Sequence, residues 1–252
     1  MRFASLGSGS RGNALVVEAG ATRLLLDCGF GPRILVQRMA RVGLAPEDLD
    51  AILVTHEHAD HVGGVAACAQ KFGLEVFLTH GTAGAAALVE ASLQVFDSHA
   101  GFAVGDLEVL PFPVPHDARE PVQFVFSDGA CRLGVLTDAG CVTPHMVEML
   151  MSCEALVLEC NHDLDMLMKG RYPPHLKRRI AGRFGHLDNS AAAELLAQLD
   201  RRRLRHVVAA HLSQENNRPE LARAALATVL GCEPEWIGVA DQDAGCDWRD
   251  VG

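Results

Sequence analysis

The sequence of 252 residues has no apolar run long enough to cross a bilayer, because charges or glycines interrupt every apolar stretch within about a dozen residues. Its opening segment, MRFASLGSGSRGN, also lacks the long apolar core and the small-residue cleavage site of a secretory signal. We therefore expect a cytoplasmic protein without membrane spans.

Paired cysteines and aromatic residues are also scarce. The eight cysteines form no CxxC pair and most lie in apolar segments, so neither a disulfide framework nor a zinc ribbon is indicated. They are typical of small, reduced core residues, although a single thiol could still bind a metal. Aromatic residues make up 5% of the chain and aliphatic residues dominate, as in buried strands covered by helices. Length and evenly spaced apolar runs predict one α/β domain over residues 1–252.

Lys and Arg are outnumbered by Asp and Glu, and the net charge of -10 argues at first against a polyanionic partner. The exception is the segment 169–206, where ten Lys and Arg stand against three acids, a local balance of +7. Such a segment is either a solvated helix face or a nucleic-acid-binding surface, and charge alone does not separate the two. Divalent cations bound at a site would add positive charge there, so global acidity does not exclude a phosphate substrate.

Histidine and aspartate are concentrated in one stretch, THEHADHVGG (55–64), which directly follows an apolar run. His56 and His58 are two residues apart, so an extended backbone would point both rings to one side. Asp60 and His61 then open a segment with helical spacing. The alternative is a polar surface loop with a helix N-cap at Asp60. The density of ligand-type side chains instead favours a metal site at the end of a buried strand.

Apolar spacing and turn residues predict the rest of the chain. Strands are expected over 3–6, 14–18, 22–27, 51–54, 75–78, 94–96, 155–159, 206–210 and 236–240, with hairpins over 101–113 and 121–136. Helices are expected over 32–42, 60–73, 82–91, 144–151, 191–199 and 219–230, and the basic segment is predicted to be helical with breaks at Gly182 and Gly185. The tail from Asp241 is polar, and we expect it to fray.

Three further candidate ligands follow predicted strands. Prolines on both sides of Val114 prevent a strand from continuing to His116, while Asp138 lies in the turn TDAG and His211 comes directly after a strand. Together with the 55–64 corner, the candidate ligands are His56, His58, Asp60, His61, His116, Asp138 and His211. That number suits two cations with Asp138 between them. Two divalent ions about 3.5–4 Å apart can share a hydroxide near neutral pH and hold the leaving oxygen.

The THEHADHVGG segment, followed in order by His116, Asp138 and His211, resembles the signature of the metallo-β-lactamase superfamily over nearly the whole chain. The resemblance implies an α/β fold, a four-layer αβ/βα sandwich with a dinuclear metal site at one sheet edge. It also implies that one metal is held by His56, His58 and His116 and the other by Asp60, His61 and His211.

More closely, the segments FASLGSGSRGN, LDCGF, ECNHD, GHLDN and AHLSQENNRPELA are similar to the YycJ (WalJ) group, whose members are described as DNA exonucleases acting from the 5′ end. In that group the fourth residue of the GHLDN-like piece is usually Ser. This chain has Asp188 there, which would put a carboxylate where a phosphate might approach.

The ribonuclease Z and ribonuclease J groups resemble this chain in having a histidine between the bridging Asp and the last ligand, and His186 fits by position. We expect it to contact the scissile phosphate or assist the leaving oxygen, the alternative being a histidine that caps its helix. Other candidate substrate contacts are Ser10 and Asn13, in a Gly/Ser-rich turn that could equally be a plain hairpin connection, and Asn189, at a helix N-terminus that could seat a phosphate. His162 is a weaker candidate.

The predicted function is therefore a two-metal phosphodiesterase on nucleic acid, a 5′-to-3′ DNA exonuclease in which the shared hydroxide attacks phosphorus, with Asp60 and His186 as catalytic residues. The cofactors would be two divalent ions, Zn²⁺ or Mn²⁺, and the chain could form a homo-oligomer. Two alternatives stand beside it. A glyoxalase II-like thioester or lactone hydrolase shares every ligand, although few residues follow His211 for its helical substrate domain. A di-iron redox protein would usually carry Glu in place of His58.

Overall fold

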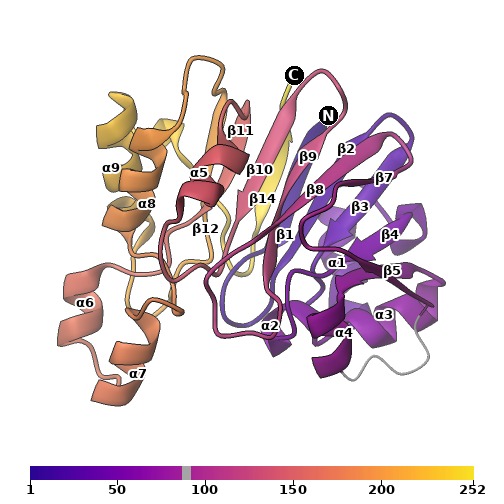
Figure 1. The fold of residues 1–252 in the computed structure, drawn as a ribbon, viewed down its shortest axis with the longest axis horizontal. Helices are drawn as coiled ribbons and strands as arrows, with labels where there is room; N and C mark the ends of the chain where they lie inside the picture. The colour runs from indigo at the N-terminus through magenta and orange to yellow at the C-terminus, as the bar shows by residue number, and fades with distance from the viewer. Residues whose placement is uncertain (87–91) are drawn as a thin grey trace.

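A computed structural model describes residues 1–86 and 92–252, and these form two mixed sheets packed face to face with helices on both outer surfaces (Figure 1). The strands are β1 (Arg2–Gly7), β2 (Ala14–Ala19), β3 (Thr22–Leu26), β4 (Ala51–Leu53), β5 (Glu75–Thr79), β6 (Ser92–Phe96), β7 (Phe102–Val104), β8 (Leu107–Pro113), β9 (Val122–Ser127), β10 (Arg132–Leu136), β11 (Ala155–Glu159), β12 (His206–Ala210), β13 (Gly238–Val239) and β14 (Cys246–Asp250). The helices are α1 (Pro32–Arg41), α2 (Ala59–Val62), α3 (Val65–Phe72), α4 (His80–Ala85), α5 (Pro144–Leu150), α6 (Leu164–Lys169), α7 (Pro174–Ile180), α8 (Asn189–Gln198) and α9 (Pro219–Leu230).

The two sheets share one plan. The first has the strand order β14-β1-β2-β3-β4-β5-β6 and the second β13-β12-β11-β10-β9-β8-β7 within the described residues. In each sheet one half is antiparallel, and the other half, β3 to β6 or β10 to β13, is parallel. Because the carboxyl ends of parallel strands meet at the same edge, side chains that follow β3, β4, β10, β11 and β12 can gather at one place.

Apolar residues form three layers of core, which accounts for the sandwich. Phe3, Phe124 and Phe126 belong to the cluster between the sheets. A second cluster joins the first sheet to α1 and α3, and a third joins the second sheet to α5, α8 and α9. The predicted four-layer α/β sandwich is therefore confirmed. All eight cysteines are free thiols, as expected. Within the described residues, no helix combines the length and the apolar character that a membrane span requires.

The predicted helix over 60–73 is wrong as a single element, because it is broken into α2 and α3 at Gly63 and Gly64. Here the chain is pressed against the loop after β3: the Gly64 N–H donates to the Cys28 carbonyl at 2.8 Å, and a Cβ on Gly64 would lie 1.9 Å from the Phe30 carbonyl oxygen. Helical spacing in the sequence does not reveal this backbone contact.

Three other predicted segments differ in the structure or lie partly outside its described residues. The tail after Asp241 does not fray: it turns at Gly245 and pairs as β14 with β1, and the Trp248 indole donates to the Val42 carbonyl at 2.9 Å. The strand predicted over 236–240 is shortened to β13, since a 3₁₀ turn occupies Pro234–Trp236. Of the helix predicted over 82–91, the first turn lies in α4, and residues 87–91 lie outside the described part of the chain.

Candidate metal centre

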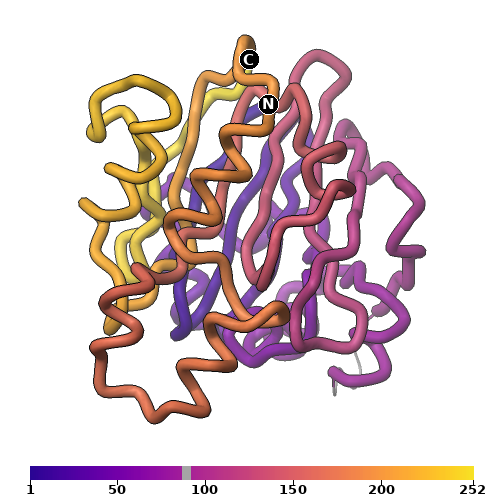
Figure 2. Tube along the Cα trace, turned by 60° about the vertical axis from the view of Figure 1, so that its left-hand side comes forward, coloured from indigo at the N-terminus to yellow at the C-terminus, as the bar shows by residue number. Residues whose placement is uncertain are grey.

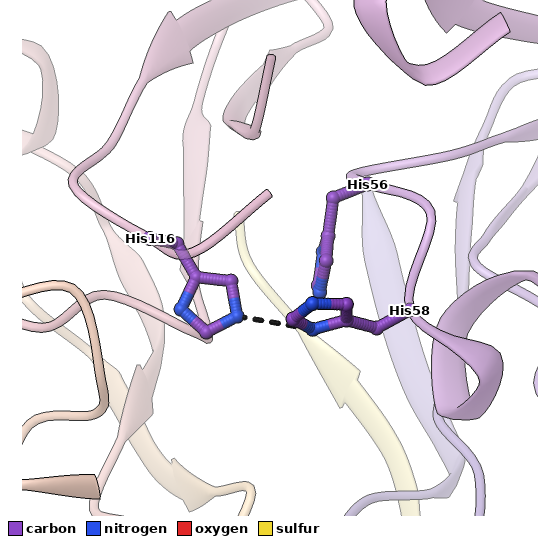
Figure 3. Close-up of side chains that lie close together, drawn as sticks. All are labelled: His56, His58 and His116. Carbon is purple, nitrogen blue, oxygen red and sulfur yellow. Dashed lines mark hydrogen bonds between the residues drawn. The ribbon is translucent and has the colours of Figure 1, made fainter. Parts of the chain in front are cut away.

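Three imidazoles from two different sheets meet at one edge of the sandwich. His56 and His58 follow β4, and His116 follows β8 after Pro115, so the rings approach from opposite sides (Figure 3). His116 Nε2 lies 3.2 Å from His58 Nδ1, and the His56 ring centroid is 4.6 Å and 4.9 Å from those of His58 and His116. Their ligand atoms all lie within 4.8 Å of one another.

A second group lies directly beside the first. The Asp60 Oδ2 atom is 3.5 Å from His61 Nε2 and 3.4 Å from His211 Nε2. Asp138 lies between the two groups. Its Oδ2 is 3.1 Å from His61 Nε2, and ligand atoms of Asp138, His56 and His61 all lie within 4.8 Å of one another. The structure therefore brings together all seven residues that the sequence singled out.

Asp27 and Thr55 orient two of these imidazoles, although the sequence patterns did not single them out. The His61 Nδ1–H donates to Asp27 Oδ2 at 2.8 Å. Thr55 Oγ1 donates to the same carboxylate at 2.9 Å, so it must accept from His56 Nδ1, also at 2.9 Å. Both rings therefore turn Nε2 toward the cluster. Carboxylates that fix the tautomer of a histidine in this way are usual partners of metal-binding imidazoles.

Glu159, the last residue of β11, orients imidazoles on the other side of the cluster. Its carboxylate is fully buried and accepts from His186 Nδ1 at 2.8 Å and from the backbone N–H groups of Ala139 and Leu187 at 2.9 and 3.2 Å. His211 Nδ1 lies 3.4 Å from the same carboxylate. Asp27 and Glu159 both close an apolar strand, which is the pattern that identified Asp138, so the sequence did contain a signal for them.

The buried ionisable groups shift one another's pKa values. Burial by itself would lower the pKa of His61 and His211, but Asp138 and the other nearby carboxylates outweigh it, raising the pKa of His61 well above its usual value and that of His211 to about 10. Burial and the neighbouring His61 charge hold the pKa of His56 well below its usual range. A cation bound here would displace protons from His61 and His211, so its affinity should increase with pH.

The donor set fits divalent metal ions. His56 Nε2 and Asp138 Oδ2 are buried and have no hydrogen-bond partner among the described residues. A buried polar atom without a partner costs about 1–3 kcal/mol, and coordination would satisfy both atoms. Imidazole nitrogen with carboxylate oxygen is a combination that Zn²⁺ and Mn²⁺ accept.

A cavity of about 350 Å³ opens onto this cluster. Its lining includes His58, Asp60, Asp138, His186 and His211 from the cluster, and Ser10, Asn161, Tyr172, Leu176, Arg179 and Ser213 around them. This volume is at the lower end of the range for ligand pockets.

The three predicted substrate contacts lie in different surroundings. Ser10 lines the cavity. Asn13 is buried and holds the Gly/Ser-rich turn, accepting from the Gly9 N–H at 2.8 Å and lying 3.1 Å from His61 Nε2, so it contacts the cluster more directly than the cavity. Asn189 is also buried, and its amide pairs with that of Asn217 through two 2.9 Å hydrogen bonds. The structure does not bring Asn189 into the cavity.

Asp188 is the N-cap residue of α8, at the helix N-terminus that the sequence predicts as a phosphate seat. Its carboxylate accepts from the Ser190 and Ala191 N–H groups at 2.7 and 2.9 Å. A serine could make the same cap, which explains how Asp can replace it. The backbone donors that would have held a phosphate are thus occupied. His162 pairs with Asp188 in an isolated β-bridge and is buried.

Comparisons with known proteins agree with this geometry. Residues 22–211 match the family profile of a Beta-lactamase superfamily domain. Exodeoxyribonuclease YycJ of Bacillus anthracis is 36% identical over 247 residues, which cover 96% of this chain and 92% of the relative. Exodeoxyribonuclease WalJ of Streptococcus pneumoniae is 33% identical over 245 residues, which cover 94% and 91%.

Solved structures show the same fold at low sequence identity. The metallo-β-lactamase fold protein YhfI of Bacillus subtilis aligns with a TM-score of 0.75 at 15% identity, covering 98% of each chain. The short form of human tRNase Z aligns with a TM-score of 0.68 at 16% identity and covers both chains completely.

Proposed function

Because the chain belongs to the metallo-β-lactamase superfamily and, within it, to the YycJ/WalJ group, we propose that it is a two-metal phosphodiesterase that degrades DNA from the 5′ end. The observation that carries the proposal is the cluster of seven candidate ligands, four of which line one cavity together with His186: His58, Asp60, Asp138 and His211. Relatives that align over nearly their whole length are named exodeoxyribonucleases, which supports DNA as the substrate. The setting would be the cytoplasm, with residues 1–252 acting as one hydrolase domain.

Two sets of residues would hold the cations. His56, His58 and His116 form one set and Asp60, His61 and His211 the other, and Asp138 is placed to touch both. Bound there, divalent ions such as Zn²⁺ or Mn²⁺ would lower the pKa of water and polarise the phosphoryl group. The Asp60 side chain is partly exposed to the cavity, so its carboxylate can accept the proton that the attacking water loses.

His186 would serve the leaving oxygen. Because Nδ1 donates to Glu159, the ring is held in one orientation and Nε2 is the nitrogen left to face a substrate. The side chain is 21% exposed and lines the cavity, so a phosphate ester bound there would be within its reach. Glu159 does not itself line the cavity; it acts through His186, which does, and is therefore a positioning residue. The helix-capping alternative for His186 is not favoured, because Asp188 caps α8 instead.

The glyoxalase II-like alternative is not favoured. It shares the ligand set, but the relatives that align over nearly the full length are named nucleases. Hydrolysis of a thioester panel faster than that of nucleic acid would reverse this preference.

The deciding experiment is cleavage of 5′- and 3′-labelled single- and double-stranded DNA and RNA by the purified protein with Mn²⁺, Mg²⁺ or Zn²⁺. We expect mononucleotides to be released from the 5′ end of DNA, and no activity from the Asp60→Ala variant. Release from the 3′ end would refute the polarity. Faster cleavage of RNA would refute the substrate, and no cleavage with any of the three metals would refute the proposal as a whole.

A further inference from the structure

Residues 164–185, which we call the basic arm, project beyond the edge of both sheets. The arm contains α6 and α7 and follows β11 in the chain; it extends past the strand ends in two views (Figures 1 and 2). Every residue of α7 is at least partly exposed. α7 therefore contributes little to the hydrophobic core, and its side chains are available for contacts outside the chain.

Positive charge dominates the arm. Six Lys and Arg stand against one acid, a balance of +5 in a chain whose net charge is -10. Lys169 pairs with Asp165 at 2.7 Å and Arg179 with Asp117 at 2.7 Å. Arg171, Arg178 and Arg183 are exposed and make no ion pair within the described part of the chain. Lys177 also makes no ion pair there, but its Nζ donates to the Met168 carbonyl at 2.7 Å. Three exposed arginines without counter-charges therefore face solvent beside an acidic body.

Large apolar side chains are exposed on the same arm. Leu164, Met168 and Phe184 are 47%, 49% and 56% exposed. Tyr172, the only tyrosine in the sequence, lies on the arm as well and lines the cavity. Aromatic rings interleaved with unpaired cations are the combination by which proteins hold unpaired nucleic acid strands, with bases on the rings and phosphates on the cations.

The arm is fastened to the metal centre. The His116 Nδ1–H donates to the Gly185 carbonyl at 2.9 Å, and Arg179 binds Asp117, the neighbour of His116. Tyr172, Arg179 and Gly185 all line the cavity. Phe184 is next to Gly185 in the chain. A nucleic acid strand lying along the arm would therefore lead directly into the cavity.

We propose that the basic arm binds an unpaired nucleic acid strand and guides its end to the metal centre, with Arg171, Arg178 and Arg183 on phosphates and Phe184 stacked on a base. The inference rests on the proposed nuclease function and adds the single-stranded form of the substrate and the surface that selects it. An anionic lipid surface would also be attracted to exposed cations beside Leu164 and Met168. The strand is favoured because Tyr172 and Arg179 face the cavity and not the outer side alone.

The test compares the metal-loaded protein with two triple charge reversals. The arm variant is Arg171→Glu/Arg178→Glu/Arg183→Glu. The control, Lys71→Glu/Arg201→Glu/Arg205→Glu, makes the same change of charge at exposed residues outside the arm. Binding of a fluorescent phosphorothioate single strand, which resists cleavage, is measured by anisotropy over a series of salt concentrations. We expect the arm variant to bind at least ten-fold more weakly. Its plot of log affinity against log salt should be shallower by about 2, since each lost phosphate contact removes about 0.7.

Phe184 supplies an independent measurement. Phe184→Ala should weaken binding of the single strand about five-fold or more, the effect of losing one stacked base, while Phe184→Trp should restore it. Binding of blunt duplex should change less, because its bases are already stacked. Hydrolysis of the small diester bis(4-nitrophenyl) phosphate should be unchanged in all of these variants, since none of the substituted side chains lines the cavity.

Each other result overturns the inference. If the wild type binds and cleaves DNA and the arm variant behaves like the control, the arm is not the strand-binding surface and the proposed function survives. If the wild type binds no nucleic acid, both proposals fail. If the wild type binds vesicles of phosphatidylglycerol, loses that binding in the arm variant and keeps its affinity for the strand, the arm is a lipid-binding surface instead.

Discussion

Replacing Glu159 by Gln tests whether a fully buried carboxylate positions the catalytic side of the centre. The side chains are nearly the same size, so the change removes charge without opening a cavity. In the wild type, one carboxylate oxygen accepts from His186 Nδ1 at 2.8 Å and the other from the Ala139 and Leu187 N–H groups. An amide has one oxygen and one NH₂ group. If its oxygen stays with the backbone donors, its NH₂ faces His186 Nδ1 and reverses the tautomer of that ring.

The expected loss of activity follows from the two functions that the reversed tautomer would impair, proton transfer by His186 and metal binding by His211. Proton transfer by a well-placed histidine is worth about 10²–10⁴-fold in rate. Loss of a carboxylate that orients a metal-binding histidine costs about 10–100-fold in metal affinity, and His211 Nδ1 lies 3.4 Å from the same Glu159 oxygen. We therefore expect kcat on single-stranded DNA to fall about 10²-fold or more at saturating metal, with a weaker metal Kd.

Glu154 provides the control, because it is a second buried glutamate just before the other end of β11. It accepts from the Arg132 N–H at 2.8 Å and pairs with Arg203. Glu154→Gln should cost stability comparable to that of Glu159→Gln, about 1–3 kcal/mol for a poorly satisfied buried group, without changing kcat or metal affinity. A Glu159→Gln enzyme with kcat within three-fold of the wild type, or an equal loss in both variants, would refute the positioning role.

Three further predictions concern the metals and the fold. Asp60→Ala should retain one metal ion per chain where the wild type retains two, as measured by elemental analysis; two retained ions would exclude Asp60 as a ligand. Removing metal with a chelator should lower Tm, and Mn²⁺ or Zn²⁺ should restore it, because an ion at 100 times its Kd adds about 2.7 kcal/mol; an unchanged Tm would contradict a built site. Glu18 accepts from Arg2 and Arg23, both at 2.7 Å, and although burial opposes it, these contacts lower the pKa of Glu18 from 4.5. Its stabilisation is therefore fully present above the unfolded pKa and lost as pH falls through the lowered folded value, so Glu18→Gln should cost about 1 kcal/mol at pH 7, discounted for partial exposure, and approach zero cost in acid. A pH-independent difference in the free energy of unfolding would contradict this.

The seven candidate ligands could be read from the sequence because their positions follow a rule of backbone geometry. Each follows an apolar strand or lies in the corner after one, and parallel strands deliver such residues to a common edge. Asp27 and Glu159 obey the same rule but lie outside any dense motif, and their roles depend on which imidazole packs against them. That information exists only in the assembled sheets.

Other features of the fold could not be predicted from the sequence for similar reasons. The pairing of Asn189 with Asn217 joins residues 28 positions apart, and β14 pairs with β1 across the whole chain. The break between α2 and α3 depends on a backbone contact with the loop after β3. In each case local spacing describes one partner and says nothing of the other.

Asp27, Asp138 and His211 share a backbone feature with a cost of its own. Their φ angles are 59°, 58° and 54°, in the left-handed region that favours glycine. For a residue other than glycine this conformation costs of the order of 1 kcal/mol. Glycine at these positions would relax the chain while deleting the chemistry. Selection for thermal resistance alone would therefore tend to erase this centre, and its retention would be a record of selection for activity.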